Sequence, residues 1–273
     1  MKELLKRSIS GLLFASVLLG AVALGSWSFA LLFGVFSVFI LREFYQLAKA
    51  SGVSPQKKLG LFIGGLIFVL TFLHVKGIFT ANPIAIFLAL FFIVPVCELY
   101  RAKKNSLQNM AVTLFGIIYV IFPFSLYNLV VFPDFPHSGR YTPQLLVFVF
   151  FLIWAFDSGA YLFGVSFGKH RLFERISPKK SWEGFFGGWF LSLVFAVAIN
   201  HLYPEFKLIF MLLFATIVSI TSTFGDLVES MIKRNIGIKD SGKFLPGHGG
   251  LLDRFDSILY AAPFVYLLIH FLR

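Results

Sequence analysis

The chain has 273 residues, of which 58% are apolar, 18% are aromatic and only 14% are charged. A water-soluble surface needs roughly 25–35% charged residues, so this composition excludes an ordinary soluble domain. The net charge of +11 would suggest a nucleic-acid partner in a soluble protein, but basic residues collect in the cytoplasmic loops of membrane proteins, so we expect no nucleic acid.

Apolar runs of about 20 residues, the length that crosses a hydrocarbon core as a helix, follow one another along the chain. The predicted spans are 9–24, 27–47, 58–75, 82–100, 107–131, 143–167, 184–202, 207–231 and 251–272. Only Gly25 and Ser26 divide the first two spans, which together are too long to cross once, so we predict a tight hairpin there. No Ala-x-Ala cleavage site follows the first run, and we expect it to be retained. The predicted fold class is all-α, a polytopic integral membrane protein with about nine transmembrane helices.

The basic residues divide unequally between the two sides that nine spans define. The side with the N-terminus carries 20 Lys and Arg, and the other side carries 4, namely Lys76, Arg140, Lys207 and Arg273. By the positive-inside rule the richer side is cytoplasmic. We therefore expect a multi-pass protein of the inner membrane, with a cytoplasmic N-terminus and an external C-terminus. Cys97, in an apolar run, is the single cysteine, and one cysteine cannot form an intrachain disulfide or a cysteine metal cluster.

Acidic residues inside spans are costly and are candidates for function. Glu43 and Glu98 lie near cytoplasmic span ends in the first half, and we interpret them as snorkelling or helix-end groups. The second half has Asp157 in the sixth span, Asp226 and Glu229 in the eighth, and Asp253 and Asp256 in the ninth.

The last two pairs each have a spacing of three, which places both members on one helix face. Because the eighth and ninth spans meet on the cytoplasmic side, the four carboxylates can converge, and they repel one another unless a cation lies between them. Ligands that are all oxygen favour Mg²⁺, so we predict a magnesium site. A buried salt-bridge network with Lys233, Arg234 and Arg254 stays open as the alternative.

Two predicted cytoplasmic loops, 169–183 and 232–250, lie beside these acids. The second is rich in glycine and in cations and leads into a helix N-terminus, a combination that suits an anion. In the first, Lys179 and Lys180 precede a predicted helix start at Ser181. Two cations beside a metal site suit a substrate with several phosphates. We interpret His248 as a hydrogen-bond donor to phosphate.

The motifs in these loops are long. One runs Ser230-Met-Ile-Lys-Arg, Lys239-Asp-Ser-Gly and Leu245-Pro-Gly-His-Gly-Gly-Leu-Leu-Asp-Arg-Phe-Asp256, and the other runs Asp157-Ser-Gly-Ala-Tyr161, Phe167-Gly-Lys-His170 and Ser177-Pro-Lys-Lys-Ser-Trp-Glu-Gly184. At these residues the chain resembles the phosphatidate cytidylyltransferase (CDP-diacylglycerol synthase) family. Family members commonly have Thr where this chain has Ser158 and Ser181. The motifs cover the C-terminal half, so we expect N-terminal helices in 1–105 and the catalytic region in 106–273.

The resemblance implies that CTP and phosphatidic acid react to give CDP-diacylglycerol and pyrophosphate in the bilayer. It also implies Mg²⁺, with a monovalent cation such as K⁺ as a second candidate ion, and a homodimer. The predicted catalytic residues are Asp226, Asp253, Asp256 and Lys180, with the three aspartates as metal ligands. The predicted substrate-binding residues are Lys179, Lys180, Ser181, Lys233, Arg234, Lys239, Asp240, His248, Gly249, Gly250 and Arg254. Asp157 and Glu229 are predicted to support the metal ligands or to bind a second cation.

Two other functions stay open. A CTP-dependent polyprenol or phytol kinase would release CDP, and it would need a dedicated base for its alcohol nucleophile. A cation transporter would use the intramembrane acids as its pathway, but it predicts acids spread through the membrane depth and pseudo-symmetric halves.

Overall fold

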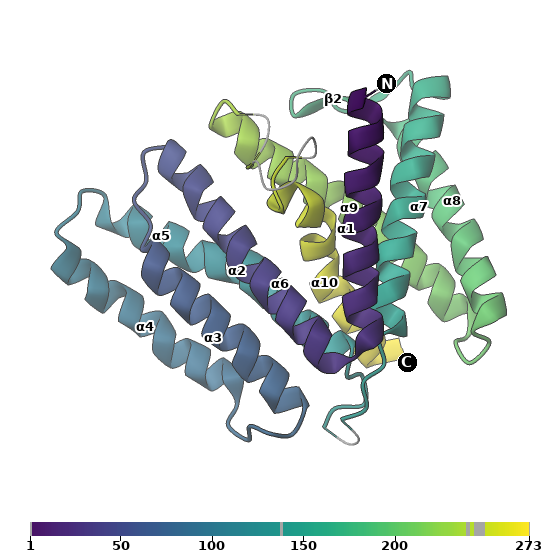
Figure 1. Cartoon of the computed structure of the whole chain (residues 1–273). Helices are drawn as coiled ribbons and strands as arrows, with labels where there is room; N and C mark the ends of the chain where they lie inside the picture. The colour runs from purple at the N-terminus through teal and green to yellow at the C-terminus, as the bar shows by residue number, and fades with distance from the viewer. Residues whose placement is uncertain (1, 137–138, 239–240, 243–248, 273) are drawn as a thin grey trace. The chain divides into compact units, whose positions relative to one another are not determined.

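The computed structural model describes residues 2–136, 139–238, 241–242 and 249–272, with the side chains of residues 2–8 excepted, and it is mainly helical (Figure 1). The helices are α1 (Lys2–Leu24), α2 (Ser26–Ala50), α3 (Lys57–Val75), α4 (Pro83–Arg101), α5 (Ser106–Gly116), α6 (Phe122–Val130), α7 (Gln144–Phe167), α8 (Trp182–Leu202), α9 (Leu208–Asn235) and α10 (Leu252–Leu272). A π-helical turn, η1 (Ile117–Ile121), joins α5 to α6, and two short strands, β1 (Arg171–Phe173) and β2 (Ser177–Ser181), lie between α7 and α8.

Eight of the described helical segments are long and apolar enough to cross a membrane, with α5, η1 and α6 together forming one segment. The apolar stretch Ile9–Leu24 of α1 is shorter. The first predicted span falls on that stretch and the other eight each overlap one of the eight segments, which confirms the polytopic all-α fold class. Gly25 separates α1 from α2 with a φ of 141°, a backbone conformation that favours glycine.

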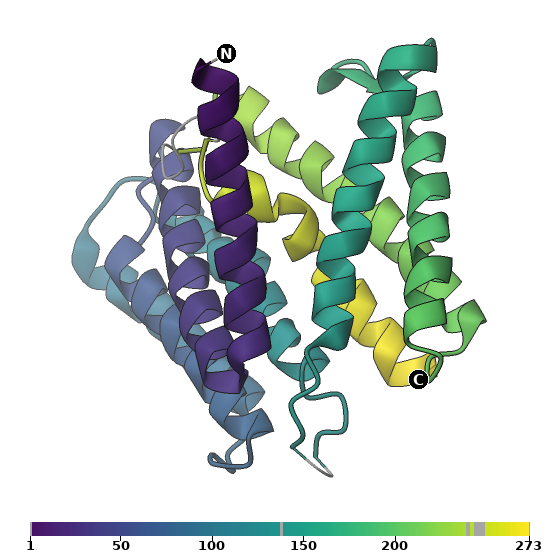
Figure 2. The ribbon, with the colours of Figure 1, turned by 45° about the vertical axis from the view of Figure 1, so that its right-hand side comes forward.

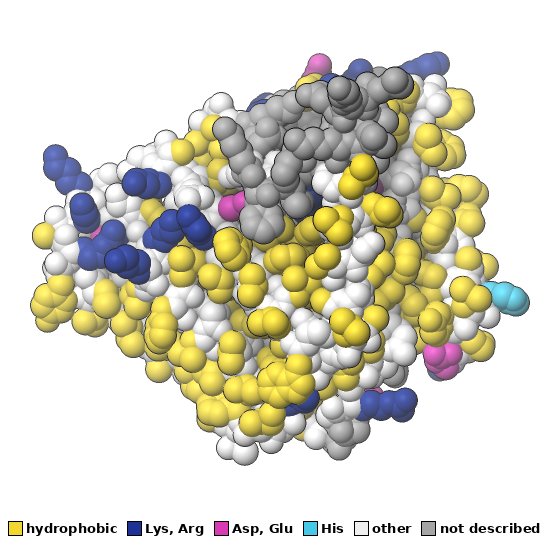
Figure 3. All heavy atoms as spheres, viewed as in Figure 1, with side chains coloured by type: hydrophobic (Ala, Val, Ile, Leu, Met, Phe, Trp, Pro, Cys, Tyr) yellow, Lys and Arg dark blue, Asp and Glu magenta, His cyan; other side chains and the backbone are white. Residues whose placement is uncertain are grey.

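The outward surface of these helices is apolar. Figure 3 shows hydrophobic side chains over much of the visible surface of α2, α3 and α4. Phe62, Ile84 and Phe92 are each between 64% and 68% exposed. Apolar surface on this scale is unusual for a soluble monomer and is what contact with lipid chains requires.

The chain divides into two compact units. Unit 1 comprises Met1–Pro143 and Ile236–Arg254, and unit 2 comprises Gln144–Asn235 and Phe255–Arg273. The first turn of α10 therefore belongs to unit 1 and the rest of that helix belongs to unit 2. This division rests on packing. The division at residue 105 rests on the position of chemical motifs, and it stays a prediction.

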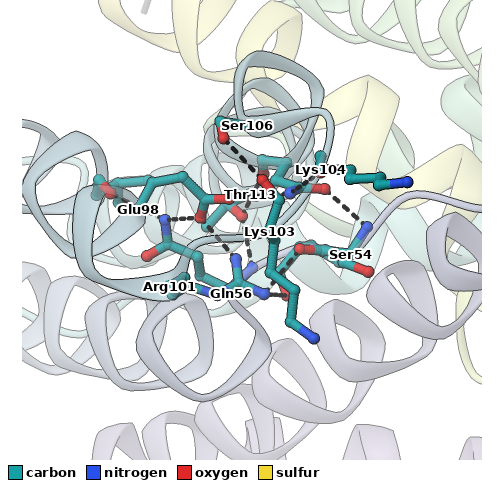
Figure 4. Close-up of polar contacts among 11 residues, drawn as sticks. Ser54, Gln56, Glu98, Arg101, Lys103, Lys104, Ser106 and Thr113 are labelled. Carbon is teal, nitrogen blue, oxygen red and sulfur yellow. Dashed lines mark hydrogen bonds and ion pairs between the residues drawn. The ribbon is translucent and has the colours of Figure 1, made fainter.

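A buried polar network holds the ends of three helices together in unit 1 (Figure 4). Glu98 of α4 accepts hydrogen bonds from Gln56 Nε2 at 2.6 Å, Arg101 Nη1 at 2.7 Å and Asn109 Nδ2 at 2.9 Å. Arg101 also donates to the carbonyl of Ser54 at 2.9 Å. Since Glu98 is only 3% exposed, its interpretation as a snorkelling group is wrong. It acts as a helix-end group that ties α4 to the start of α3 and to α5.

Close helix packing organises unit 2. Figure 2 shows α7 and α8 side by side, and glycines make that approach possible. A Cβ atom at Gly159 would lie 2.9 Å from both the Gly187 carbonyl oxygen and the Gly188 Cα atom. Small residues allow helix backbones to approach closely in membranes, where dispersion contacts drive association. The α7–α8 pair thereby forms a firm support for the connection between the two helices.

That connection contains an antiparallel hairpin that the sequence did not predict. Strand β1 pairs with β2 through Arg171 opposite Ser181 and Phe173 opposite Ser177, with an irregular register between them. Such short, charged strands carry little alternation of apolar and polar residues, so the pattern in 169–183 reads as a loop. Ser181 ends β2 and also caps α8, because its Oγ atom accepts a hydrogen bond from the Gly184 N–H at 3.1 Å.

Candidate active site

Three carboxylates meet in unit 2. One ligand oxygen from each of Asp226, Glu229 and Asp256 lies within 4.8 Å of the others, and we call these residues the acidic cluster. Glu229 is 1% exposed and Asp256 is 8% exposed, whereas Asp226 is partly exposed. The separation of three residues along α9 places Asp226 and Glu229 on one face, toward the α10 residue Asp256.

Gly225 allows α9 and α10 to approach closely at this point. A Cβ atom at Gly225 would lie 2.6 Å from the Asp256 carbonyl oxygen and 3.0 Å from the Ser257 Cα atom. The Ser257 hydroxyl donates to the Ser222 carbonyl at 3.2 Å and links the same two helices. The backbone N–H of Ser257 donates to Asp256 Oδ1 at 2.6 Å, which fixes that carboxylate.

Two lysines contact the acidic cluster. Lys180, in strand β2, forms an ion pair with Asp226, and Lys233, one turn further along α9, forms an ion pair with Glu229. The hairpin thus brings a cation from a distant part of the sequence to the carboxylates. Two ammonium groups offset two of the three carboxylate charges when all are ionised, which makes this arrangement less costly inside a membrane protein.

A cavity of about 260 Å³ opens beside the ion pair of Lys180 with Asp226, within unit 2. Several polar residues that line it come from α7, from α9 and from the hairpin, and all of them except Thr223 are predicted site residues. These residues are Asp157, Lys179, Lys180, Ser181, Thr223 and Asp226. The cavity is too small for a whole nucleotide lipid, but its volume accommodates phosphate groups beside Lys180.

Asp253 has a different setting from Asp256. Its carboxylate accepts backbone hydrogen bonds from Ser241 at 3.0 Å and from Gly250 at 2.8 Å, all within unit 1. These contacts hold Ser241 and Gly250 close to each other. Gly249, with a φ of 83°, adopts a left-handed conformation next to Gly250. Arg254 is exposed on the first turn of α10.

The remaining predicted residues fall at the end of α9 or beyond it. Lys233 is half-buried and Arg234 is exposed in the last turn of that helix. Lys239, Asp240 and His248 lie outside the described residues.

One pair that the sequence analysis missed lies where the hairpin meets α8. His170 Nδ1 and Glu183 Oε1 are 2.6 Å apart, and the Glu183 carboxylate also accepts the His170 backbone N–H at 3.2 Å. Both residues lie within the motifs Phe167-Gly-Lys-His170 and Ser177–Gly184, which was the available signal. The pair anchors the hairpin that carries Lys180.

The acidic cluster fits a divalent cation. All of its donors are carboxylate oxygens, two of the three carboxylates are buried, and their ligand atoms are close enough to share one ion. Hard oxygen ligands of this kind suit Mg²⁺, which takes few protein carboxylates and completes its shell with water and substrate phosphates. The donor set is thus compatible with the predicted magnesium ion, although Glu229 takes the place beside Asp226 and Asp256 that the sequence analysis assigned to Asp253.

Comparison with known proteins covers almost the whole chain. Residues 5–272 match the cytidylyltransferase family. The chain is 34% identical over 277 residues to a phosphatidate cytidylyltransferase of Bacillus subtilis, covering 98% of both chains. It is 31% identical over 265 residues to one of Staphylococcus aureus, covering 96% of this chain and 98% of the relative. It is 38% identical over 183 residues to one of Staphylococcus epidermidis, covering 67% of each. The family match and the first two relatives span nearly the whole chain and agree with the helices and the motifs described above, and the chain belongs to the cytidylyltransferase family.

Proposed function

We propose that the protein transfers the cytidylyl group of CTP to phosphatidic acid and so forms CDP-diacylglycerol and pyrophosphate for phospholipid biosynthesis. The relatives that match over nearly their full length are named phosphatidate cytidylyltransferase. The observation that carries the proposal is the acidic cluster with Lys180 in contact with it. Carboxylates that can hold a metal ion, beside a cation that can bind phosphate, are the groups that chemistry on a triphosphate requires.

The reaction joins a phosphate oxygen of phosphatidic acid to the α-phosphorus of CTP. The bond between that phosphorus and the oxygen bridging to the β-phosphate breaks, and pyrophosphate leaves with the electron pair. The nucleophile is already an anion, so a strong general base is not needed. Catalysis then rests on the positioning of the two substrates and on the neutralisation of their negative charge.

The predicted ligands for Mg²⁺ are Asp226, Asp253 and Asp256, and the geometry adds Glu229 to that set. When bound, the ion would neutralise charge on the triphosphate and on the departing pyrophosphate. Lys180 and Lys233 are placed to exchange a carboxylate partner for a phosphate oxygen. Asp157 lines the cavity beside Lys180, where it can orient that lysine or contribute to binding a second cation such as K⁺.

The predicted contacts to nucleotide and lipid phosphate come from both motifs. Lys179, Lys180 and Ser181 belong to the hairpin, whereas Lys233, Arg234, Lys239, Asp240, His248, Gly249, Gly250 and Arg254 belong to the second motif. Ser181 already caps α8 through its oxygen, so its hydroxyl hydrogen is the part that remains for a substrate. The enzyme would act as a homodimer in the inner membrane, with both motifs on the cytoplasmic side.

The product distinguishes this reaction from that of a CTP-dependent kinase. Purified protein in lipid nanodiscs is incubated with phosphatidic acid and with CTP labelled either at the α-phosphate or at the γ-phosphate. We expect the α-label in the lipid product and the γ-label in pyrophosphate, with both products absent for Asp256→Asn. Transfer of the γ-label to lipid with release of CDP would contradict the proposal.

A further inference from the structure

Glu43 lies far from both sequence motifs, yet its carboxylate reaches one of them. It belongs to α2 and is 8% exposed. Its Oε2 atom accepts a hydrogen bond from the backbone N–H of Leu252 at 2.8 Å, across 209 positions of sequence. Leu252 is the first residue of α10, where backbone N–H groups have no partner within the helix. Glu43 therefore caps α10 from another helix, which corrects its interpretation as a snorkelling group.

Two glycines of the second motif pack against the same carboxylate. A Cβ atom at Gly242 would lie 2.6 Å from Glu43 Oε1, and one at Gly250 would lie 2.9 Å from Glu43 Oε2. A Cβ atom at Gly250 would also lie 2.7 Å from the Gly242 backbone nitrogen. Neither glycine has a positive φ, so close approach to Glu43 and to each other, and not backbone conformation, is what requires glycine here.

Glu43 and Asp253 thus hold the same piece of backbone. Asp253 accepts the N–H groups of Ser241 and Gly250, and Glu43 accepts that of Leu252 while both glycines pack against it. A buried carboxylate is stabilised by charge-assisted hydrogen bonds and by the positive end of a helix dipole, and both are present at this position. All of these residues belong to unit 1.

We propose that Glu43 is a positioning residue for the nucleotide site: it holds Gly242 against Gly250 and sets the first turn of α10, which carries Asp253 and Arg254. The inference rests on the proposed function, because it assigns Gly250, Asp253 and Arg254 to the binding of CTP and its metal ion. Glu43 itself contacts backbone in this arrangement and takes no part in bond making. Its loss would loosen groups that bind phosphate, and a misplacement of about 1 Å can cost up to about 100-fold in rate.

Hydrogen exchange tests the positioning without any substrate. We compare the wild type, Glu43→Ala and Glu43→Gln in nanodiscs, with Glu98→Gln as the control. Glu98 is also a buried carboxylate of unit 1, but its contacts lie in the α3–α4–α5 network. We expect exchange at the amides of residues 250–253 to be about tenfold faster in Glu43→Ala. Glu43→Gln should be intermediate because it keeps an oxygen acceptor, and Glu98→Gln should match the wild type there. Unchanged exchange in Glu43→Ala would overturn the proposal. If the alanine variant does not fold, unchanged exchange in Glu43→Gln would overturn it instead.

Kinetics then separate positioning from a purely structural role. In Glu43→Gln we expect the KM for CTP to rise about tenfold while the KM for phosphatidic acid stays within about twofold. Faster exchange with an unchanged KM for CTP would overturn the positioning role and leave the cytidylyl transfer intact. A wild type that makes no CDP-diacylglycerol would instead reject the proposed function, whatever the exchange data show.

A double-mutant cycle with Gly242→Ala gives an independent check. The added methyl group would collide with the Glu43 carboxylate, so the single variant should also raise the KM for CTP. In the Glu43→Ala background that collision is gone, and we expect Gly242→Ala to add less than about twofold. Independent, multiplying effects of the two substitutions would show that Glu43 and Gly242 do not act together.

Discussion

Lys180 is the residue that connects the hairpin to the acidic cluster, through its ion pair with Asp226. Substitution by glutamine removes a charge that we assign to the triphosphate, so we expect Lys180→Gln to lower kcat/KM by about 100-fold or more. Lys169→Gln is the matched control, because Lys169 is an exposed cation at the start of the same connection and should leave the rate unchanged. Equal losses in both variants would show that general positive charge matters, and not the place of Lys180.

Glu229 and Asp253 are the two candidates for the third metal ligand beside Asp226 and Asp256. Both have a partner aspartate three residues away, so spacing alone could not decide between them. The structure places Glu229 beside Asp226 and Asp256, with Asp253 on backbone amides. We expect Glu229→Gln to weaken Mn²⁺ binding, measured by electron paramagnetic resonance as a stand-in for Mg²⁺, by about tenfold. If Asp253→Asn weakens binding and Glu229→Gln does not, the ligand set predicted from the sequence is the correct one.

At the scale of helices, the contact between α9 and α10 depends on Gly225. A methyl group there would meet the Asp256 carbonyl, which is backbone and cannot rotate away. Overpacking of this kind typically costs about 1–3 kcal/mol, so we expect Gly225→Ala to lower the unfolding temperature and to abolish activity by shifting Asp256. Gly20→Ala is the control, since open space surrounds a Cβ atom at that helical position. Unaltered stability and activity in Gly225→Ala would show that the two helices adjust to a wider separation.

The sequence was informative about these elements to different degrees. Apolar runs located every helical segment, because the length of a span is set by the thickness of the bilayer. The hairpin 171–181 and the π-helical turn Ile117–Ile121 were not predicted, since neither leaves a periodic signal in so few residues. The two motifs predicted that Lys180, Asp226 and Asp256 belong to one active site. The contact of Glu43 with Leu252 could not be predicted, because nothing local relates two residues that are 209 positions apart.

For the whole molecule, the remaining question is which way the chain crosses the membrane. The 20-to-4 division of Lys and Arg predicts that the α4–α5 connection is cytoplasmic and the α8–α9 connection is external. Figure 3 shows basic side chains gathered where α4 leads into α5, as that prediction requires of a cytoplasmic end. An enzyme that uses CTP must also present its site to the compartment that holds the nucleotide. The positive-inside rule and the proposed function therefore predict the same orientation.

Cysteine labelling tests this orientation directly, because Cys97 is the single cysteine of the chain. In a Cys97→Ser background, Lys103→Cys reports on the α4–α5 connection and Lys207→Cys on the α8–α9 connection. A membrane-impermeant maleimide should label Lys207→Cys in intact spheroplasts, and it should label Lys103→Cys only in inverted vesicles. Activity of the Cys97→Ser parent confirms that the background is native. The reverse labelling pattern would place the acidic cluster away from cytoplasmic CTP, and it would contradict the orientation and the proposed nucleotide substrate together.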